Sequence, residues 1–431
     1  MISISFIREN PDVVKQAAAN KGISVDIDRL LVLDASLRES AKKVDNLRTE
    51  RNRLSKLVQK CVDENEKEHL AEQVRVLKSN LFSHEDSARV ARAEFDDLML
   101  HVPSIPAPEV PIGKNETDNV ELRKVGDVPT FNFPFRDHIE LCEMHDMLDT
   151  QRGTKVAGSR SYFLKNDAVI LEMAVCRFVM DFLSQRGFTP MAVPQLVKEA
   201  AMVGSGYFPI GRDQAYAVPE DELFLAGTSE VALASYHQDE ILPMSRFPIK
   251  YTGISTCYRR EAGTYGKDTR GLYRVHQFQK VEQVVLCEAN HNTAERLHYE
   301  ILENAELILQ ALELPYRVCL ACTGEIGIGQ IRKHEVETWM PSRNAYCETH
   351  SCSTLADYQA RRLGIRYRDD NGNGNGEMRY AFTLNNTGIA SPRILIPLLE
   401  NHQNEDGSVN IPKALRAYVG GVKITRKIKQ S

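Results

Sequence analysis

A stretch near the middle of the chain, TCYRREAGTYGKDTRGLYRVHQFQKVE, gathers side chains that could bind a nucleotide. Strand alternation would place Arg259 and Glu261 on one face of a first strand. The same alternation would place Arg274, Phe278 and Glu282 on one face of a second strand. If the glycine-rich decapeptide between them turns the chain back, two arginines, two carboxylates and an aromatic ring share one surface.

Such a surface has the chemistry of a nucleotide site. Arginine guanidinium groups bind phosphate through two parallel hydrogen bonds, and they are the side chains best suited to that geometry. An aromatic ring offers a stacking plane for a base, and carboxylates accept from amines or bind metal ions. The alternative is a solvated ladder of ion pairs on an exposed sheet, and these residues alone leave both interpretations open.

The N-terminal quarter of the chain has a heptad pattern of apolar residues with few glycines or prolines. We expect an antiparallel helical hairpin of residues 27–61 and 70–102, with the polar segment VDENEKEH between the helices. The seams of the second helix read Leu70, Leu77, His84, Ala91, Leu98 and Val74, Leu81, Ala88, Phe95, Val102.

The first helix of this arm carries an excess of basic residues. A polyanion-binding surface is one interpretation, because each neutralised phosphate releases counterions. A solvated coiled-coil face is the other. The candidate contacts are Arg48, Arg51, Arg53, Lys56 and Lys60.

Prolines at positions 103, 106, 108 and 111 predict a stiff connector after the arm. We therefore expect an N-terminal domain over 1–110 and a larger α+β domain over 111–431, in which strand-like and helical runs alternate. A helix near 169–186 is apolar on most sides and should end at Gly187, so it is expected in a core or a dimer interface.

Composition excludes several classes of protein. The chain of 431 residues is 26% charged and 42% hydrophobic, as in an average globular protein, and its net charge of -5 argues against a generic nucleic-acid coat. Nine scattered cysteines predict reduced thiols and a cytoplasmic location. The most apolar run contains Glu172, Arg177 and Asp181, so no membrane span is expected.

The central stretch resembles motif 2 of the class II aminoacyl-tRNA synthetases, and the whole chain is similar to the seryl-tRNA synthetase family of the bacterial type. The segments that carry the resemblance lie in the family's order: FIRENPDVVKQAAANKG at the start, then GSRSYFLKNDAVILEMA, GTSEVALASYH, the motif 2 stretch, AYCETHSCSTLADYQARRLGIRYR, and TLNNTGIASPRILIPLLENHQ as motif 3.

The resemblance implies a fold and a reaction. The fold is an α+β class II domain, an antiparallel sheet of six to seven strands flanked by helices, joined to a long coiled-coil arm that binds tRNA. Members are homodimers joined partly through motif 1, here the apolar helix and the segment QRGFTPMAVPQLV after it. The reaction is activation of L-serine with ATP and Mg²⁺ to seryl-adenylate, then transfer to the 3′ end of tRNA(Ser), with tRNA(Sec) left open as a second acceptor.

Carried over by position, the resemblance assigns ATP ligands. Arg259 would bind the α-phosphate and the serine carboxylate, Glu261 the adenine amino group, and Phe278 the adenine ring. Arg274 and Arg393 would bind the outer phosphates, and Arg259 and Arg393 are the expected catalytic residues. The remaining ATP-site positions are Val275, Glu348 and Ser351.

Glu348 and Ser351 are the expected Mg²⁺ ligands, since hard oxygen ligands suit that ion. A competing zinc site could be drawn from the cysteines of CLAC and CETHSC with His350. The family type does not use such a site, so we expect no zinc. The cysteines concerned are Cys319, Cys322, Cys347 and Cys352.

The serine site is expected where Glu282 accepts from both the ammonium and the hydroxyl of the substrate. Alanine has no hydroxyl group, so it would leave a buried acceptor unpaired and would bind less tightly than serine. Two departures from the family pattern, Ser229 in TSE and Thr387, leave the detailed pocket open. The expected serine ligands are Thr228, Glu230, Arg259, Glu282, Asn385 and Thr387.

Three local expectations concern motif 3 and the loop before it. Ser391 and Pro392 would form the N-cap and first position of a helix, which would place Arg393 in the first turn. Pro397 should kink or end that helix. The glycines of DDNGNGNGEMR, with no helix after them, predict a hairpin loop rather than a phosphate loop.

Two other function classes remain to be weighed. A non-catalytic paralogue could bind RNA or protein through the arm, although it would be expected to lose Arg259, Glu261 or Arg393, and all three are present. A related ligase could load serine or another small amino acid onto a different acceptor. A full-length arm argues against such a ligase, because a carrier ligase does not need to reach a tRNA.

Overall fold

The computed structural model describes residues 2–264, 266, 268, 270–369 and 376–425. The chain forms two compact units, Ile2–Pro103 and Ser104–Ser431. Residues 104–110, expected in the N-terminal domain, fall in the second unit. The Ser104 amide donates to the Ile328 carbonyl (2.8 Å), and Val110 packs with Ala321 and Ile326.

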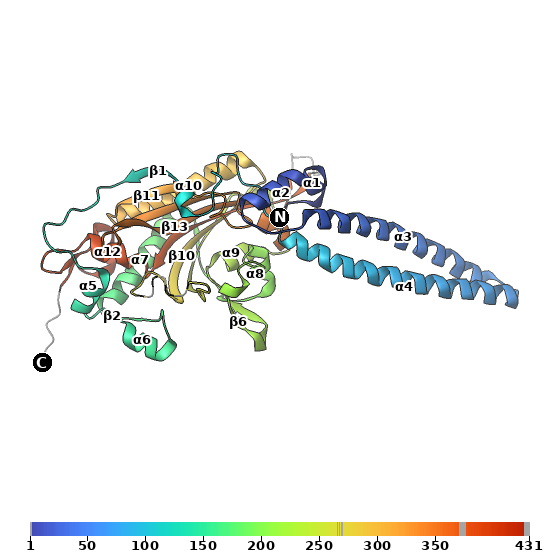
Figure 1. Ribbon diagram of the computed structural model, residues 1–431, viewed down its shortest axis with the longest axis horizontal. Coiled ribbons are helices and arrows are strands. Elements are labelled where there is room, and N and C mark those ends of the chain that lie inside the picture. Colours follow the sequence, from blue (N-terminus) through green and yellow to red (C-terminus); the bar gives the residue numbers. More distant parts are fainter. Residues whose placement is uncertain (1, 265, 267, 269, 370–375, 426–431) are drawn as a thin grey trace. The chain divides into compact units, whose positions relative to one another are not determined.

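The first unit consists of two short and two long helices. The long helices pair along their length as the heptads predict (Figure 1). Ion pairs join them at Arg29 and Glu94 (2.7 Å) and at Arg48 and Glu85 (2.8 Å). The helices are α1 (Ile4–Glu9), α2 (Pro11–Asn20), α3 (Ile27–Lys60) and α4 (Glu64–Leu100).

The second long helix begins at Glu64, six residues before the expected start at Leu70. Asp63 is its N-cap, and the Asp63 carboxylate accepts from the Glu66 amide (2.9 Å). Glu64 and Glu66 in the first turn also suit the positive end of the helix dipole. The polar segment that we expected to form a loop therefore becomes the first turns of α4, because it supplies its own cap.

The second unit is built on an eight-stranded sheet in the order β1-β11-β12-β13-β16-β10-β9-β4. Every neighbouring pair is antiparallel except β4 and β9, which are parallel. The expected antiparallel sheet is thus confirmed, with one strand more than predicted and one parallel edge. Its strands are β1 (Val120–Val125), β4 (Thr189–Ala192), β9 (Ile249–Tyr258), β10 (Gln277–Cys287), β11 (Tyr316–Leu320), β12 (Arg332–Met340), β13 (Ala345–Ala356) and β16 (Phe382–Ser391).

Three helices bury their apolar residues against one face of this sheet (Figure 1). On β10, Val281 and Val285 point into that core, and period-2 alternation turns Lys280 and Glu282 to the opposite face. That opposite face therefore carries the polar site. The three helices are α7 (Asp167–Gln185), α10 (His291–Ala311) and α12 (Leu395–Asn401).

The predicted apolar helix is α7, and Gly187 follows its C-cap with a φ of 86°. The left-handed conformation at this position favours glycine, as expected. Val175 and Val179 lie in the core, whereas the side chains of Ile170 and Met173, three residues apart, are exposed.

Motif 3 folds differently from the local prediction. Ser391 is the last residue of β16 and pairs with Gln279, so it belongs to the sheet ladder and cannot cap the helix. α12 begins at Leu395, and Arg393 lies in the turn before it. The expectation that Pro397 kinks or ends the helix is also wrong. Pro397 is the third helical residue, where the missing N–H has no intrahelical acceptor to lose.

Smaller elements complete the second unit. β14 and β15 pair antiparallel around the glycine-rich segment, whose residues 370–375 lie outside the described part of the chain. The elements are α5 (His138–Met144), β2 (Leu148–Asp149), α6 (Thr150–Ala157), β3 (Phe163–Leu164), β5 (Leu196–Lys198), α8 (Glu199–Ser205), β6 (Tyr216–Val218), β7 (Leu223–Leu225), α9 (Glu230–Ser235), β8 (Ile241–Leu242), α11 (Tyr358–Leu363), β14 (Arg366–Asp369), β15 (Glu377–Tyr380), β17 (Val409–Asn410), α13 (Arg416–Val419) and β18 (Lys423–Ile424).

No helix in the described part of the chain is long and apolar enough to cross a membrane.

Candidate active site

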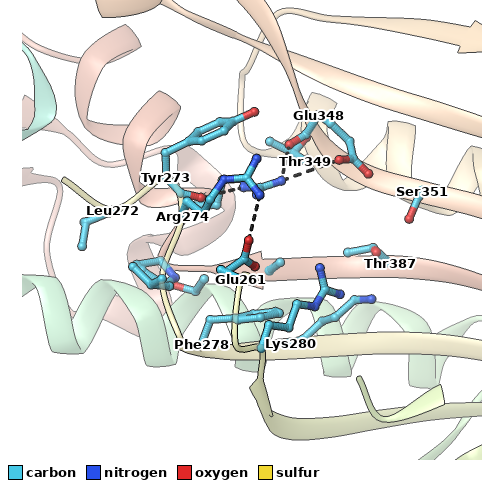
Figure 2. Close-up of a pocket in the computed structure, with 16 residues that line it drawn as sticks. Glu261, Leu272, Tyr273, Arg274, Phe278, Lys280, Glu348, Thr349, Ser351 and Thr387 are labelled. Atoms are coloured by element: carbon cyan, nitrogen blue, oxygen red, sulfur yellow. Dashed lines mark hydrogen bonds and ion pairs between the residues drawn. The ribbon is translucent and has the colours of Figure 1, made fainter. Parts of the chain in front are cut away.

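The polar face of the sheet is hollowed into a cavity of about 200 Å³ between β10, β13, β16 and the segment that joins β9 to β10 (Figure 2). All eight residues expected to bind ATP line it. Figure 2 shows Phe278 and Lys280 on one wall, with Glu348 and Ser351 on the opposite wall. The predicted residues among its lining are Arg259, Glu261, Arg274, Val275, Phe278, Glu348, Ser351, Thr387 and Arg393.

Arg259 follows the last residue of β9, and the Arg259 amide donates to the His276 carbonyl (2.9 Å). This backbone bond extends the pairing of the two strands by one step beyond β9. The Arg259 guanidinium lies 5.2 Å from the centre of the Phe278 ring, within cation–π distance. The ring thus fixes a cation at the cavity wall while leaving a plane for stacking.

Glu261 and Arg274 meet in the cavity, although not through strand alternation as expected. β9 ends at Tyr258 and β10 begins at Gln277, so both residues lie in the connecting segment. Glu261 has a φ of 52°, which turns its side chain back toward the sheet. Arg274 Nη1 then reaches Glu261 Oε2 at 2.7 Å (Figure 2). Residues 265, 267 and 269 of the segment lie outside the described residues.

A buried charge cluster adjoins the cavity. Lys280 and Glu282, two positions apart on β10, form an ion pair, and both are less than a tenth exposed. The Thr228 hydroxyl donates to Glu282 Oε2 (3.2 Å), and Lys280 Nζ donates to Thr228 Oγ1 (3.3 Å). Since an unpaired buried charge is costly, each of these groups depends on the others.

Glu230, at the start of α9, completes this cluster. Asn385 Nδ2 (2.7 Å) and Gln359 Nε2 (2.8 Å) both donate to Glu230 Oε1. Burial raises the pKa of Glu230 to about 7, and the nearby Glu282 carboxylate raises it further than Lys280 lowers it. The protonated form of this carboxyl group is therefore favoured more than in an exposed glutamate, and an incoming cation would favour its charged form.

Arg393 is held by two backbone carbonyls and an aromatic ring. Its Nε donates to the Tyr273 carbonyl (3.1 Å) and its Nη1 to the Glu348 carbonyl (3.0 Å), while the guanidinium lies 4.5 Å from the Tyr273 ring centre. These contacts hold a permanent cation in the cavity wall. α12 begins two residues after Arg393, so this side chain does not lie in the first turn of the helix as expected.

Glu348 and Ser351 lie on β13 and present a carboxylate and a hydroxyl to the cavity (Figure 2). Hard oxygen ligands of this kind fit Mg²⁺, which usually takes few protein ligands and completes its shell with phosphate and water. No group of three acidic, histidine or cysteine residues in the described ranges could hold a metal by itself. The pair therefore fits an ion that arrives with phosphate.

The cysteines of the competing zinc interpretation are engaged elsewhere. Cys352 Sγ lies against the His298 ring (3.7 Å), and His350 Nε2 contacts the Gly388 carbonyl (3.1 Å). All nine cysteines are free thiols. The absence of zinc stays a prediction.

Sequence reasoning missed three residues of this region. Lys280 shares the face of Phe278 and Glu282, and that parity was the available signal, yet it received no role. Tyr273 supports Arg393, and Gln359 on α11 supports Glu230. Tyr273 lies next to Arg274 in sequence, but its contact with Arg393 depends on motif 3, which is distant in sequence. Gln359 could not have been found from spacing, because it is brought to the site by a distant element.

Comparisons with known proteins agree with this geometry. The family described as the tRNA synthetase class II core domain (G, H, P, S and T) matches residues 216–402, and the seryl-tRNA synthetase N-terminal domain matches residues 1–106. The chain is 49% identical to the serine–tRNA ligase of Deinococcus radiodurans, over 98% of each protein.

Two solved structures are similar over nearly all of the chain. The seryl-tRNA synthetase of Pyrococcus horikoshii, complexed with ATP, matches with a TM-score of 0.90 and 37% identity, covering 99% of this chain and 100% of that one. The cytoplasmic serine–tRNA ligase of Naegleria fowleri, in complex with AMP, matches with a TM-score of 0.85 and 30% identity, covering 99% of each.

The match to the class II core domain places this chain, with its arginine-lined cavity on the polar face of the sheet, among the class II aminoacyl-tRNA synthetases. With both domains matched and its relatives covered end to end, the chain belongs to the seryl-tRNA synthetase family, whose activity is that of a serine–tRNA ligase. The resemblance read from the motifs is thereby confirmed.

The buried cluster makes a prediction about stability. Lys280→Met removes the cation that faces Glu282, and we expect the free energy of unfolding to fall by about 3–5 kcal/mol, because a buried carboxylate is left unpaired. The double variant Lys280→Met/Glu282→Gln should recover part of that loss. Urea denaturation followed by circular dichroism measures both.

Lys250→Met is the matched control. Lys250, on β9 of the same sheet, pairs with Glu300 of α10 at 2.5 Å, but both side chains are more exposed, so the expected loss is smaller. An equal loss in the two lysine variants would contradict the special role of the Lys280 pair.

Proposed function

We propose that the cavity activates L-serine at the α-phosphate of ATP and that its residues act by position and charge. A carboxylate oxygen of serine attacks the α-phosphorus, the bond to the bridging oxygen of pyrophosphate breaks, and pyrophosphate leaves with the electron pair. The attacking group is already an anion, so no general base is needed, and orientation and charge stabilisation supply the rate. The observation that carries the proposal is a buried cluster of two carboxylates and Lys280 beside an arginine-lined cavity.

The ATP residues would divide the nucleotide between them. Phe278 stacks on the adenine, and Glu261 accepts from its amino group. Arg259 binds the α-phosphate, while Arg393 and Arg274 bind the outer phosphates. The ion pair of Glu261 with Arg274 supports this division, because it holds both side chains at the cavity until ATP offers each a separate partner.

Glu348 and Ser351 would hold Mg²⁺ against the ATP phosphates. When bound, the ion neutralises charge that develops on the leaving pyrophosphate. The support for this proposal is the pair of hard oxygen ligands on β13 at the cavity wall. We propose no zinc.

Serine would bind over the charge cluster. Its ammonium lies between Glu282 and Glu230, its carboxylate faces Arg259, and its hydroxyl bonds to Glu282. The groups around it are hydroxyls and an amide, supplied by Thr228, Thr387 and Asn385. Alanine would leave buried acceptors unpaired and should therefore be rejected.

The acceptor would be tRNA(Ser), with tRNA(Sec) as a second acceptor, bound in part by the arm of the first unit. The support is the exposed basic side chains on α3, of which Lys56 and Lys60 have no described acidic partner among the ion pairs. Arg48 and Arg53 pair with Glu85 and Glu50, in exposed ion pairs that a phosphate could replace. The Arg51 guanidinium donates to the Asn52 side chain.

The chain would act as a cytoplasmic homodimer. Ile170 and Met173 leave an apolar strip exposed on α7, and the motif 1 interface of the family would cover it. Nine free thiols suit a reducing compartment.

Serine-dependent exchange of pyrophosphate into ATP tests the activation step. We expect exchange with serine and Mg²⁺ in the wild-type protein, and a loss of roughly 100- to 1,000-fold in Arg259→Gln, because a cation at the α-phosphate is removed. Arg246→Gln, on a different surface segment, should keep wild-type exchange. A folded wild-type protein without serine-dependent exchange would refute the proposal.

The arm has a separate test. Lys56→Glu/Lys60→Glu should lower kcat/KM for tRNA in serylation about 10-fold and flatten its salt dependence by about one unit of slope per lost contact. Exchange should stay at the wild-type rate, because activation does not involve the arm. The matched control is Lys413→Glu on the second unit. Unchanged serylation in the arm variant would show that α3 presents only a solvated face.

A further inference from the structure

A buried histidine contacts the backbone of the segment that carries part of the proposed phosphate site. His138, the first residue of α5, is 7% exposed, and the Leu272 amide donates to its Nε2 atom (3.3 Å). Leu272, Tyr273 and Arg274 are consecutive residues in the wall of the active-site cavity (Figure 2). The contact of His138 with the site therefore passes through this backbone.

The Leu272 contact determines which ring nitrogen of His138 carries the proton. A backbone amide can only donate, so Nε2 must accept with its lone pair, and the neutral ring then has its proton on Nδ1. Nδ1 lies 2.8 Å from Oε1 of Glu400, and this carboxylate oxygen can accept that proton in a hydrogen bond. The two contacts of the ring thus require the same tautomer.

Glu400, on α12, holds the ring in this orientation. Its side chain is fully buried, and Oε1 accepts from both the backbone amide (2.9 Å) and Nδ1 of His138. Oε2 accepts from the Ser342 amide (3.0 Å). An ionised carboxylate only accepts, so it suits three N–H donors, and burying it without them would be costly. Glu400 therefore connects α5 and α12 to the segment that lines the cavity.

A second route leads from Glu400 to the same segment. Ser342 lies in a short 3₁₀ turn, and the guanidinium of the next residue, Arg343, lies 3.8 Å from the centre of the Tyr273 ring. Tyr273 supports Arg393 through its carbonyl and its ring. Both routes thus end at groups that position the proposed ligands of the outer phosphates.

Gly271 permits the close approach of this segment to the imidazole. Its φ is 78°, a conformation that favours glycine, and a Cβ atom added there would lie 2.3 Å from Nε2 of His138. A side chain at this position would push the segment away from the ring. The space and the hydrogen bonds around His138 therefore both match its contact with Leu272.

The alternative is that His138 serves only to pack α5. His145, the C-cap of α5, is a histidine of that kind: it is 2% exposed, and its Nε2 contacts the Gly407 carbonyl (2.8 Å). His138 instead contacts the segment that carries Arg274. The two histidines thus form a matched pair on one helix.

We propose that His138, oriented by Glu400, is a positioning residue for the outer phosphates of ATP. Its ring holds the Leu272 amide and thereby sets where Arg274 lies in the cavity wall. Serine is bound by other elements, so its affinity does not depend on this contact. The inference rests on the proposed function, which assigns Arg274 and Arg393 to those phosphates.

Two amide substitutions separate the two contacts of the ring. In His138→Asn the side-chain nitrogen can replace Nδ1 and donate to Glu400, but the side chain is too short to accept from Leu272. In His138→Gln the amide oxygen can replace Nε2 as the acceptor. We expect the Kd for ATP with Mg²⁺ to rise about 10-fold in His138→Asn and to stay within about threefold of wild type in His138→Gln. Isothermal titration calorimetry measures both.

AMP shows whether the effect lies at the outer phosphates. Because AMP lacks those phosphates, His138→Asn should bind it within about twofold of wild type. In serine-dependent exchange, the KM for ATP should rise about 10-fold in this variant, while the KM for serine stays within about twofold. Equal losses of AMP and ATP affinity, or equal losses of ATP affinity in the Asn and Gln variants, would overturn the proposal.

Gly271→Ala tests the same contact without changing the ring or Glu400. The added methyl group should move the segment off Nε2, so ATP affinity should fall about 10-fold while AMP affinity is kept. Unchanged ATP affinity in this variant would contradict the positioning role, even if His138→Asn does not fold.

The matched control is His145→Asn. It should lower the melting temperature, because a buried contact is lost, and leave ATP affinity at the wild-type value. If this variant loses ATP affinity as His138→Asn does, the effect comes from the packing of α5 and the proposal fails.

Binding and exchange keep two kinds of failure distinguishable. A wild type without serine-dependent exchange refutes the proposed function, and the comparison of ATP with AMP still decides the role of His138. A wild type that exchanges, beside a His138→Asn variant that binds ATP equally tightly, refutes the positioning role alone.

Discussion

The site depends on one buried ion pair, that of Lys280 with Glu282 on the polar face of β10. Two opposite charges at this depth are stable only because each satisfies the other and both bond to Thr228. The pair lies between the proposed phosphate cations and Glu230, so it separates a region that suits anions from one that suits an ammonium group. Serine carries both a carboxylate and an ammonium group, and ATP carries anionic phosphates.

The sheet makes this pair possible. Helices α7, α10 and α12 bury one face, so alternation along β10 leaves the opposite face for polar groups. Pairing with β9 and β16 fixes β10 on both sides, and the register sets Glu282 opposite Gly253 and Thr387. At Gly253 the missing side chain leaves room for Leu233 and Ser229, which an added Cβ atom would meet. Rigid strands therefore hold the cluster, while the segment between β9 and β10 carries Glu261 and Arg274.

Sequence reasoning worked where a local pattern has one physical solution. Heptads predicted the paired helices of the arm, and the apolar run ending at Gly187 predicted α7. The motifs identified the residues expected to bind ATP, and these residues line one cavity. Sequence reasoning failed where one local signal outweighed another. Asp63 caps α4 earlier than the polar segment suggested, and Ser391 pairs within the sheet instead of capping a helix. Arg274 and Glu261 meet because the chain turns at Glu261, and the alternation of side chains along a strand does not predict such a turn. Gln359 contacts Glu230 only because the tertiary fold brings α11 to α9.

The central claim is that the buried cluster around Glu230 and Glu282 receives the serine ammonium. Burial raises the pKa of Glu230 to about 7, and a cation beside it favours the carboxylate, so serine should displace a proton. Calorimetry of serine binding at pH 7, in buffers that differ in ionisation enthalpy, measures that proton. We predict release of a measurable fraction of a proton per site in the wild type and none in Glu230→Gln. Serine binding with no proton release in the wild type, or with equal release in the variant, would contradict the account.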